Sequence, residues 1–220
     1  NVYFFVAGYM NRGRHEGESG VGLYHYDASS GTVEEKLFVD TNRSYDLLRR
    51  DVEELAYITE DQSSFYMLLD GNIYQINLAT MEMTTLMEGL KLGCVEGSAT
   101  GQHFAYLKEN EPYNSSTISM MNLDTGEEKE ITCAGSERIR MLGYLGESLV
   151  YGVADEADID SSEEGTELFP MKQVNIVDEN GESQKEYAQT GYSGSYFSSE
   201  ESSRSFMLPY MPASFPRHRR

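Results

Sequence analysis

The feature that most constrains the fold of this chain is a short phrase that occurs four times. Each copy is an apolar or aromatic strand, then Asp or Asn, then a tight turn with Gly or Thr, then a charged strand, and the copies cover residues 23–31, 73–80, 118–126 and 174–181. The pivots Asp27, Asn77, Asn122 and Asp178 are 50, 45 and 56 residues apart. A period of roughly 40 to 50 residues built from short strands is typical of a β-propeller, in which each repeat is one blade.

The repeats predict an all-β domain over residues 1–201, followed by an irregular basic tail at 202–220 that ends in Arg217-His218-Arg219-Arg220. We expect four-stranded antiparallel blades at about 1–40, 44–90, 91–135 and 136–190, and a closing strand at 191–199. A single all-β domain can exceed 200 residues without splitting.

Runs of β-forming residues separated by turn signals locate the strands of each repeat. They lie at 52–58, 64–69, 73–78 and 83–87 in the second repeat, at 92–95, 103–107, 117–123 and 128–133 in the third, and at 138–145, 148–154, 172–177 and 183–187 in the fourth. Asp70-Gly71 is a strong hairpin turn between two of them.

The first repeat shows only three strands, at 2–7, 21–27 and 33–39. Its innermost strand is either missing or supplied by residues 192–198, which would close a ring of four blades by covering an open sheet edge. We favour an open arc cut from a ring of six to eight blades, because the chain starts abruptly on a strand and ends off the repeat pattern.

One stretch has a second interpretation. Tyr45, Leu48, Val52 and Leu55 recur at helical intervals behind Ser44, a residue type that caps helices. A short helix and a strand at 52–58 are both open for this stretch.

The chain has 17 basic and 37 acidic residues, a formal net charge of −20. Such a charge repels phosphate backbones and anionic lipid surfaces, so nucleic acid and membrane partners are disfavoured. No apolar run is long enough to span a bilayer.

The two cysteines, Cys94 and Cys133, fall on the first and fourth strands expected for the third blade. Three strand spacings separate such positions by roughly 14 Å, which is too far for a disulfide. We expect two free thiols.

The third repeat resembles the TolB-like propeller repeat of bacterial envelope proteins, a relative of WD-type blades. The residues that carry the resemblance are Ser98-Ala99-Thr100-Gly101, Phe104-Ala105-Tyr106, Asn122-Leu123-Asp124-Thr125-Gly126 and Ile131-Thr132. Ala99 and Thr100 stand where the family has Pro and Asp. The resemblance implies a secreted or periplasmic scaffold that binds other proteins, although such blades also gate prolyl-oligopeptidase-type hydrolases.

We expect structural roles for the motif residues. Gly101 and Gly126 suit turns with positive φ, and the side chains of Asn122 and Asp124 can bond the turn backbone. The strand tyrosines are interpreted as filler between neighbouring blades: Tyr24, Tyr26, Tyr74 and Tyr106.

No catalytic or metal-binding pattern stands out. The segment Gly191-Tyr192-Ser193-Gly194-Ser195 is the nearest approach to a hydrolase nucleophile elbow, but its last residue is Ser instead of Gly. The four histidines are spread over separate repeats or tails without metal-ligand spacing, which favours surface or packing roles: His15, His25, His103 and His218.

Two charged segments are possible binding loops. The acidic insertion at 155–169 places Asp158, Asp160 and Ser162 at the first three ligand positions of a calcium-loop template. Glu163 and Phe169 do not fit the template, so a solvated loop is the better interpretation. The basic turn at 11–15 and the pair Arg49-Arg50, taken as a second loop, could grip an acidic partner. Two sequons, at Asn42 and Asn114, fit surface loops.

The sequence thus favours a non-enzymatic propeller without cofactors, which presents rim loops to a protein or polymer partner in a bacterial envelope or outside the cell. Two alternatives stay open: a piece of a larger hydrolase without its catalytic domain, and a small-molecule or glycan binder at the channel mouth. The absence of Trp disfavours glycans, since sugar faces stack best on large aromatic rings.

Overall fold

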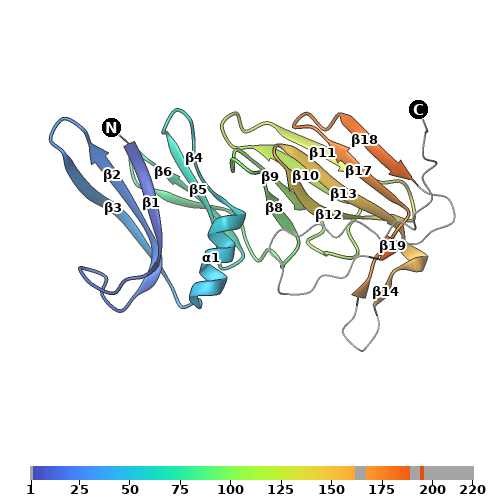
Figure 1. The fold of residues 1–220 in the computed structure, drawn as a ribbon, viewed down its shortest axis with the longest axis horizontal. Helices are drawn as coiled ribbons and strands as arrows, with labels where there is room; N and C mark the ends of the chain where they lie inside the picture. Colours follow the sequence, from blue (N-terminus) through green and yellow to red (C-terminus); the bar gives the residue numbers. More distant parts are fainter. Residues whose placement is uncertain (1, 162–166, 189–193, 196–220) are drawn as a thin grey trace, which may run out of the picture.

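The computed structural model describes residues 2–161, 167–188 and 194–195. These residues form antiparallel β-sheets, one α-helix and a short 3-10 helix (Figure 1). The first sheet contains β1 (Val2–Tyr9), β2 (Ser19–Asp27) and β3 (Thr32–Thr41). The second contains β4 (Ala56–Ile58), β5 (Ser64–Leu69), β6 (Asn72–Asn77) and β7 (Met83–Met87).

The third sheet contains β8 (Val95–Gly97), β9 (His103–Leu107), β10 (Thr117–Asn122) and β11 (Glu128–Thr132). The fourth contains β12 (Glu137–Leu145), β13 (Ser148–Asp155), β17 (Gln173–Val177) and β18 (Ser183–Ala188). Between β13 and β17 lie the 3-10 helix η1 (Glu156–Asp158) and three two-residue strands, β14 (Asp160–Ser161), β15 (Glu167–Leu168) and β16 (Pro170–Met171).

Within each of the four sheets, strands pair antiparallel in chain order. The first sheet has three strands and the other three have four, so the first sheet is one strand short, as the first repeat is. The first strand of the third sheet lies later than expected, because β8 starts at Val95, the last residue of the expected run at 92–95.

The pivot residues explain why the phrase repeats. In all four copies the pivot side chain accepts a hydrogen bond from the backbone N–H two residues later, at 2.9 Å, and the pairs are Asp27 with Ser29, Asn77 with Ala79, Asn122 with Asp124 and Asp178 with Asn180. Asp and Asn favour this local turn because their short side chains reach the chain just ahead. The turn then reverses the chain into the next strand.

The two glycines expected in turns have a positive φ, as predicted. Gly101 has φ of 79° and Gly126 has φ of 73°, and the hairpin at Asp70-Gly71 has positive φ at both residues. Two consecutive positive φ values are what a tight two-residue hairpin loop requires.

Successive sheets pack face to face and bury one hydrophobic cluster at each junction. Leu23 and Phe65 belong to the cluster between the first and second sheets, and Leu68 and Phe104 to the one between the second and third. Ile118 and Ile139 belong to the cluster between the third and fourth. Tyr74 and Tyr106 pack against these clusters as expected. Tyr24 and Tyr26 do not fill a junction, because they lie on the outer side of the first sheet.

The stretch after the first sheet is helical. The helix α1 covers Tyr45–Glu54, with Leu48 fully buried, and the strand expected at 52–58 shrinks to β4. Ser44 occupies the N-cap position without a side-chain capping bond. This stretch forms a helix because Leu48 then packs into the cluster between the first two sheets, with Val52 beside it.

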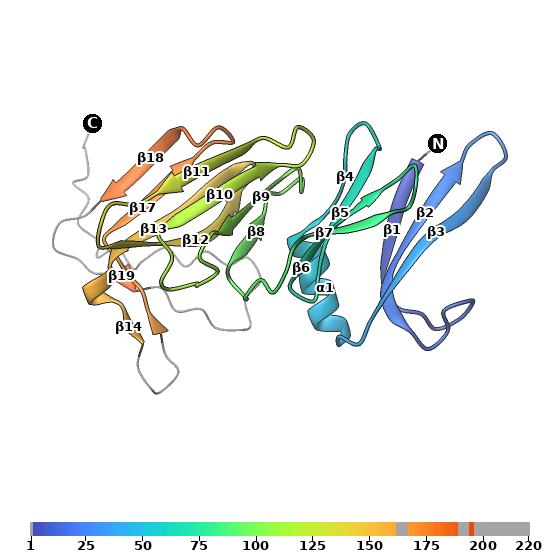
Figure 2. The same cartoon turned by 180° about the vertical axis from the view of Figure 1, so that it is seen from behind.

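The first and fourth sheets lie at opposite ends of the described arrangement, which forms an open series of blade-like sheets (Figures 1 and 2). Of the expected closing strand, only β19 (Gly194–Ser195) is described, and it pairs with β16 in the fourth repeat. This differs from the expected pairing beside β1. The rest of 191–199 and the basic tail at 202–220 lie outside the described residues.

Both cysteines are free thiols, as predicted. Cys94 lies just before β8 and Cys133 just after β11, at the two edges of the third sheet. In the part of the chain that is described, no helix has the length and apolar character needed to cross a bilayer.

Candidate functional site: the polar network of the third repeat

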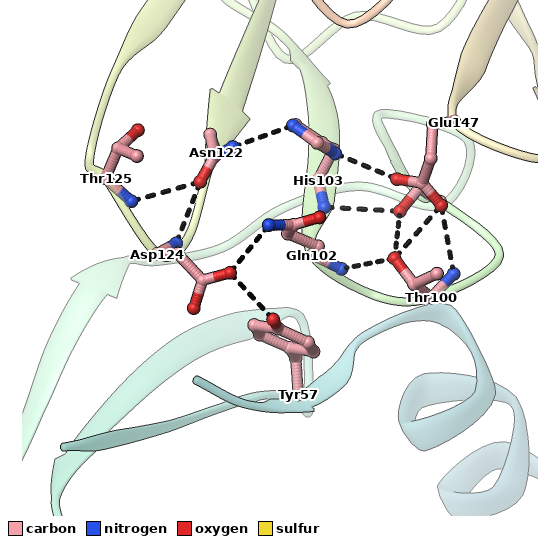
Figure 3. A network of polar contacts seen from close by, with 9 residues as sticks. Tyr57, Thr100, Gln102, His103, Asn122, Asp124, Thr125 and Glu147 are labelled. Carbon is pink, nitrogen blue, oxygen red and sulfur yellow. Dashed lines mark hydrogen bonds and ion pairs between the residues drawn. The ribbon is translucent and has the colours of Figure 1, made fainter. Parts of the chain in front are cut away.

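The densest set of polar side-chain contacts surrounds the third repeat, on the side where the short turns lie (Figure 3). His103, at the start of β9, is the centre of this network and is only 4% exposed. Its Nδ1 lies 2.8 Å from a carboxylate oxygen of Glu147, and its Nε2 lies 2.9 Å from the side-chain nitrogen of Asn122. The histidine therefore connects two strands of its own sheet to the turn of the next sheet.

The protonation of His103 follows from its partners. The Oδ1 atom of Asn122 accepts the backbone N–H groups of Asp124 and Thr125, so its amide nitrogen must face the ring. That nitrogen can only donate, so Nε2 of His103 accepts, and the ring proton sits on Nδ1 and is donated to Glu147. Both ring nitrogens are thus occupied.

Glu147, between β12 and β13, binds the third repeat at three points. It accepts the ring N–H of His103, the Thr100 hydroxyl at 3.0 Å and the Thr100 backbone N–H at 3.2 Å. Burial alone would raise the pKa of this carboxyl, but the hydrogen bonds from His103, Ser98 and Thr100 together lower its pKa below the usual value. These contacts fasten the fourth sheet to the third.

Asp124 fastens the third sheet to the second. Its carboxylate accepts the Tyr57 hydroxyl at 2.8 Å and the backbone N–H of Glu60 at 3.0 Å. Gln102 also donates to it, at 2.7 Å. Asp124 was expected to bond its own turn; it bonds the neighbouring repeat instead, while Asn122 has the predicted turn role. Burial, followed by the bond to Asp124, raises the pKa of Tyr57.

This arrangement is unsuited to nucleophilic catalysis. A nucleophilic hydroxyl needs a base that can take its proton, but the Thr100 hydroxyl donates to Glu147, whose lowered pKa makes it a weak base. Because both nitrogens of His103 are engaged, the ring cannot shuttle a proton without breaking a bond in the network. The network can instead hold three sheets in register.

A polar cleft of about 280 Å³ lies beside the network, between the third and fourth sheets. Its walls include His103, Asn122, Lys129, Glu179 and Asn180. His103 and Asn122 already bond each other. The cleft therefore offers mainly the exposed ends of Lys129, Glu179 and Asn180 to solutes.

A second charged group lies where the innermost strands meet α1. Glu54 ends α1 and accepts the backbone N–H of Gly97 at 2.7 Å, Glu96 is on β8, and the Arg140 guanidinium on β12 lies 4.4 Å from the centre of the Tyr113 ring. Burial and the nearby charge of Glu54 raise the pKa of Glu96, while Arg140 opposes this shift. A side chain at position 97 would meet the backbone oxygen of Glu54 at 1.9 Å, so only glycine allows this close approach.

The remaining sequence candidates are dispersed. His15, in the first hairpin, lies between Glu18 and Glu35, and the ring of His25 lies 4.8 Å from that of Tyr3, in a tilted arrangement, in the first sheet. Arg49 and Arg50 lie on α1, contrary to the expected loop. Asn42 and Asn114 are exposed, as surface sequons would be.

The described part of the acidic insertion contains Asp158 on η1 and Asp160 on β14. Within residues 2–161, 167–188 and 194–195, no group of three or more potential metal ligands gathers. Ser162, Glu163, His218 and the first three residues of Gly191-Tyr192-Ser193-Gly194-Ser195 lie outside the described residues. Sequence analysis did not single out Glu147, because its partners are in another repeat and no local pattern marks them.

Comparisons with known proteins add little beyond the fold. No protein-family model matches the chain, and no curated protein matches it. Among solved structures, dipeptidyl peptidase 4 of Porphyromonas gingivalis aligns with 87% of this chain at 10% identity and a TM-score of 0.33. TolB of Acinetobacter baumannii aligns with 79% at 15% identity and a TM-score of 0.29.

The chain spans 38% of the length of the first of these proteins and 52% of the second. At such low TM-scores, the fold assignment depends on the strand order and sheet packing of this chain itself. Those features make it an all-β protein built from successive blade-like antiparallel sheets.

Proposed function

We propose that this chain is a non-enzymatic β-propeller module, formed as an open arc, that binds a protein or polymer partner through loops on one face. The proposal rests on the observation that the polar residues best suited to chemistry in this chain join its sheets to one another. His103, Glu147 and Asp124 are the best candidates for chemistry, and each is occupied in joining one sheet to another. A site that is fully used for assembly favours a scaffold over an enzyme.

The two faces of the arc differ in what they offer to a partner. Short turns at 28–31, 78–82, 123–127 and 178–182 occupy one face, and the longer connectors occupy the other. These connectors are the hairpin at 10–18, helix α1, the loop at 108–116 and the insertion that follows β13. Long loops on a rigid scaffold are where binding residues concentrate, so we place the partner site on the long-connector face.

Basic side chains gather on the long-connector face although the chain as a whole is acidic. Those in or beside the connectors are Arg12, Arg14, Arg43, Arg49, Arg50, Lys91, Lys108, Arg138 and Lys172. Several are paired there with carboxylates, as in the contacts of Lys172 with Glu137 and Asp155 at 2.6 Å. A surface of mixed charge suits a protein partner, because complementary charges give specificity. The location in a bacterial envelope or outside the cell follows from the resemblance of residues 98–132 to the TolB-like repeat.

The binding proposal is tested by screening the labelled chain against a peptide array and comparing two charge-reversed variants. Arg49→Glu with Arg50→Glu alters the long-connector face, and Glu179→Lys with Glu182→Lys alters the short-turn face. We expect peptides that bind the unaltered chain to lose at least tenfold in affinity with the first variant and little with the second. The reverse pattern would place the site on the other face.

The proposal that the chain is not an enzyme is tested with chromogenic peptide and ester substrates. We expect no turnover above buffer. Turnover that disappears in His103→Gln or Glu147→Gln, while both variants stay folded by circular dichroism, would contradict the proposal.

A further inference from the structure

The outer face of the first sheet is apolar and bare. Side chains that alternate with those packed on the second sheet point away from it: Val2, Phe4, Val6, Tyr24, Tyr26, Val33 and Phe38. Val2 is 52% exposed, Val6 45% and Val33 57%. Figures 1 and 2 both show this sheet at the end of the arrangement, with no other described sheet beyond it. Contiguous apolar patches of this kind usually mark an interaction surface.

The aromatic side chains of this face are ordered by contacts within the sheet. Phe4 and Tyr24 stack with ring centroids 5.5 Å apart, and Phe38 stacks against His15 at 3.8 Å. Phe38 lies over Gly20 and Tyr24 lies over Gly22, since a Cβ on either glycine would come within 2.8 Å of the ring. These contacts hold the aromatic side chains against the sheet, and the face is called the platform below.

The opposite end of the arc is finished differently. On the fourth sheet, Gly152 faces outward and the side chain of Met171, on β16, lies directly over it. Val150 and Ala154, on the same side of β13, are 5% and 0% exposed, and Phe169 is fully buried. The chain's own segment after β13 therefore covers the part of this face that lies over β13, while Tyr187 on β18, on the same side of the sheet, is 49% exposed.

From this difference we infer that the outer face of the first sheet binds the same face of a second copy of the chain. The contact continues the packing that already joins the sheets within one copy, where aromatic and aliphatic side chains of alternate strand positions meet. A head-to-tail contact would need the outer face of the fourth sheet, where the side chain of Met171 stands over β13 and keeps a second sheet from packing flat against it. Symmetric pairing of like faces brings together two faces that no described segment covers, and such a contact closes at two copies.

Charge also favours this face over the rest of the surface. A chain with a net charge of −20 repels its own copies. The one carboxylate in the middle of the platform, Glu35, is held by His15 at 3.0 Å and by Arg14 at 3.5 Å. Its negative charge is balanced locally, so the platform can approach another copy with less repulsion than other parts of the surface.

The size of the platform sets the strength of the contact. Three strands about 4.8 Å apart and about eight residues long cover roughly 400 Å². Two such faces would bury roughly 800 Å² in total, which is less than the roughly 1,200 Å² at which stable specific interfaces begin and is in the range of weak, transient contacts. The expected dimer is therefore weak, with dissociation in the micromolar range or above.

Sedimentation equilibrium on the full chain tests this inference, from about 10 to about 500 µM protein, a range that brackets a weak dimer. We expect the average mass to rise from one copy towards two and to stop there. Added salt should strengthen the association, because it screens the repulsion between acidic copies while leaving apolar contact intact.

Two variants localise the contact. Val6→Lys places a charge in the platform and should weaken association at least tenfold. The matched control is Met83→Lys, since Met83 on β7 is 44% exposed, close to the 45% of Val6, but lies on the second sheet. It should associate like the unaltered chain, and circular dichroism should show both variants folded.

Three results would overturn the inference. The first is an average mass of one copy at every concentration. This result overturns the inference even if residues 196–220 or another protein are then found to cover the face. The second is growth beyond two copies, which indicates open-ended stacking. The third is equal association by the unaltered chain and Val6→Lys. None of these results bears on the peptide-binding test of the proposed function, so the two proposals can fail separately.

Discussion

The first and fourth sheets begin from the same local device but end the arc in different ways. Both contain the pivot turn, with Asp27 and Asp178 bonding the backbone two residues ahead. The fourth sheet is covered over β13 by the chain that follows this strand, and it is fastened to the third sheet by Glu147. Among the described residues, no segment covers the outer face of the first sheet or pairs with the free edge of β1. The repeat therefore determines the strands and turns of each sheet, while the neighbouring segments determine whether its outer face is covered.

The largest expected effect contrasts two phenylalanines at the two ends. Phe169→Ala removes a fully buried ring beside β16 and should cost about 3 to 5 kcal/mol of unfolding free energy, because it leaves a cavity. Phe4→Ala removes a partly exposed ring from the bare face and should cost less than about 1 kcal/mol. Urea unfolding followed by circular dichroism measures both. Equal losses would mean that the two ends are equally covered in solution.

The next largest effect concerns the link between the third and fourth sheets. Glu147→Gln keeps the size of the side chain but removes the charge that accepts bonds from His103 and Thr100. Hydrogen bonds to a charged group are worth about 2 kcal/mol, so we expect a loss of that order at pH 7.

The pH dependence of this loss has a definite sign. The folded-state pKa of Glu147 lies below the usual value of 4.5 for a glutamate side chain. Its stabilisation is therefore fully present above about pH 4.5 and is lost as the pH falls through the folded pKa. The gap in unfolding free energy between the unaltered chain and Glu147→Gln should shrink in that acid range. A gap that stays constant down to pH 3 would exclude the carboxylate as its source.

A smaller effect tests whether the pivots contribute in the same way along the chain. Asn77→Ala removes the acceptor for the backbone N–H groups of Ala79 and Thr80 and should cost about 1 kcal/mol. Chemical unfolding measures this loss, and Asn77→Asp, which retains the acceptor, is the control. If Asn77→Asp lost as much as Asn77→Ala, the turn bond would not be the cause.

The smallest effect belongs to the first sheet and has the opposite pH dependence to Glu147. Hydrogen bonding to Glu35, opposed by burial and helped by Glu18, raises the pKa of His15 above 6.5. The raised pKa means that its contribution is fully present below pH 6.5 and is lost as the pH rises through the folded value. An NMR titration should give a pKa above 6.5 that returns towards 6.5 in Glu35→Gln. If the pKa of His15 in the unaltered chain is not raised, the hydrogen bonds to Glu35 and Glu18 do not hold this side chain in solution.

Sequence reasoning located most strands because their signals are local. The runs at 64–69, 83–87 and 103–107 match β5, β7 and β9 to the residue. It missed the network, since His103 and Glu147 are 44 residues apart and Tyr57 and Asp124 are 67 apart. No short pattern records such a pairing, which exists only after the sheets have stacked.

The sequence by itself determined the repeat, its turns and the short first sheet, because an Asp or Asn bonds a backbone only two residues away whatever the rest of the chain does. Only the tertiary structure decided which sheet faces are covered. Burial of a face depends on the packing of another sheet or segment against it, as Met171 packs over Gly152 and no described side chain packs over Val2 or Val33. For this reason Tyr24 and Tyr26, which the sequence placed between sheets, lie on an open face.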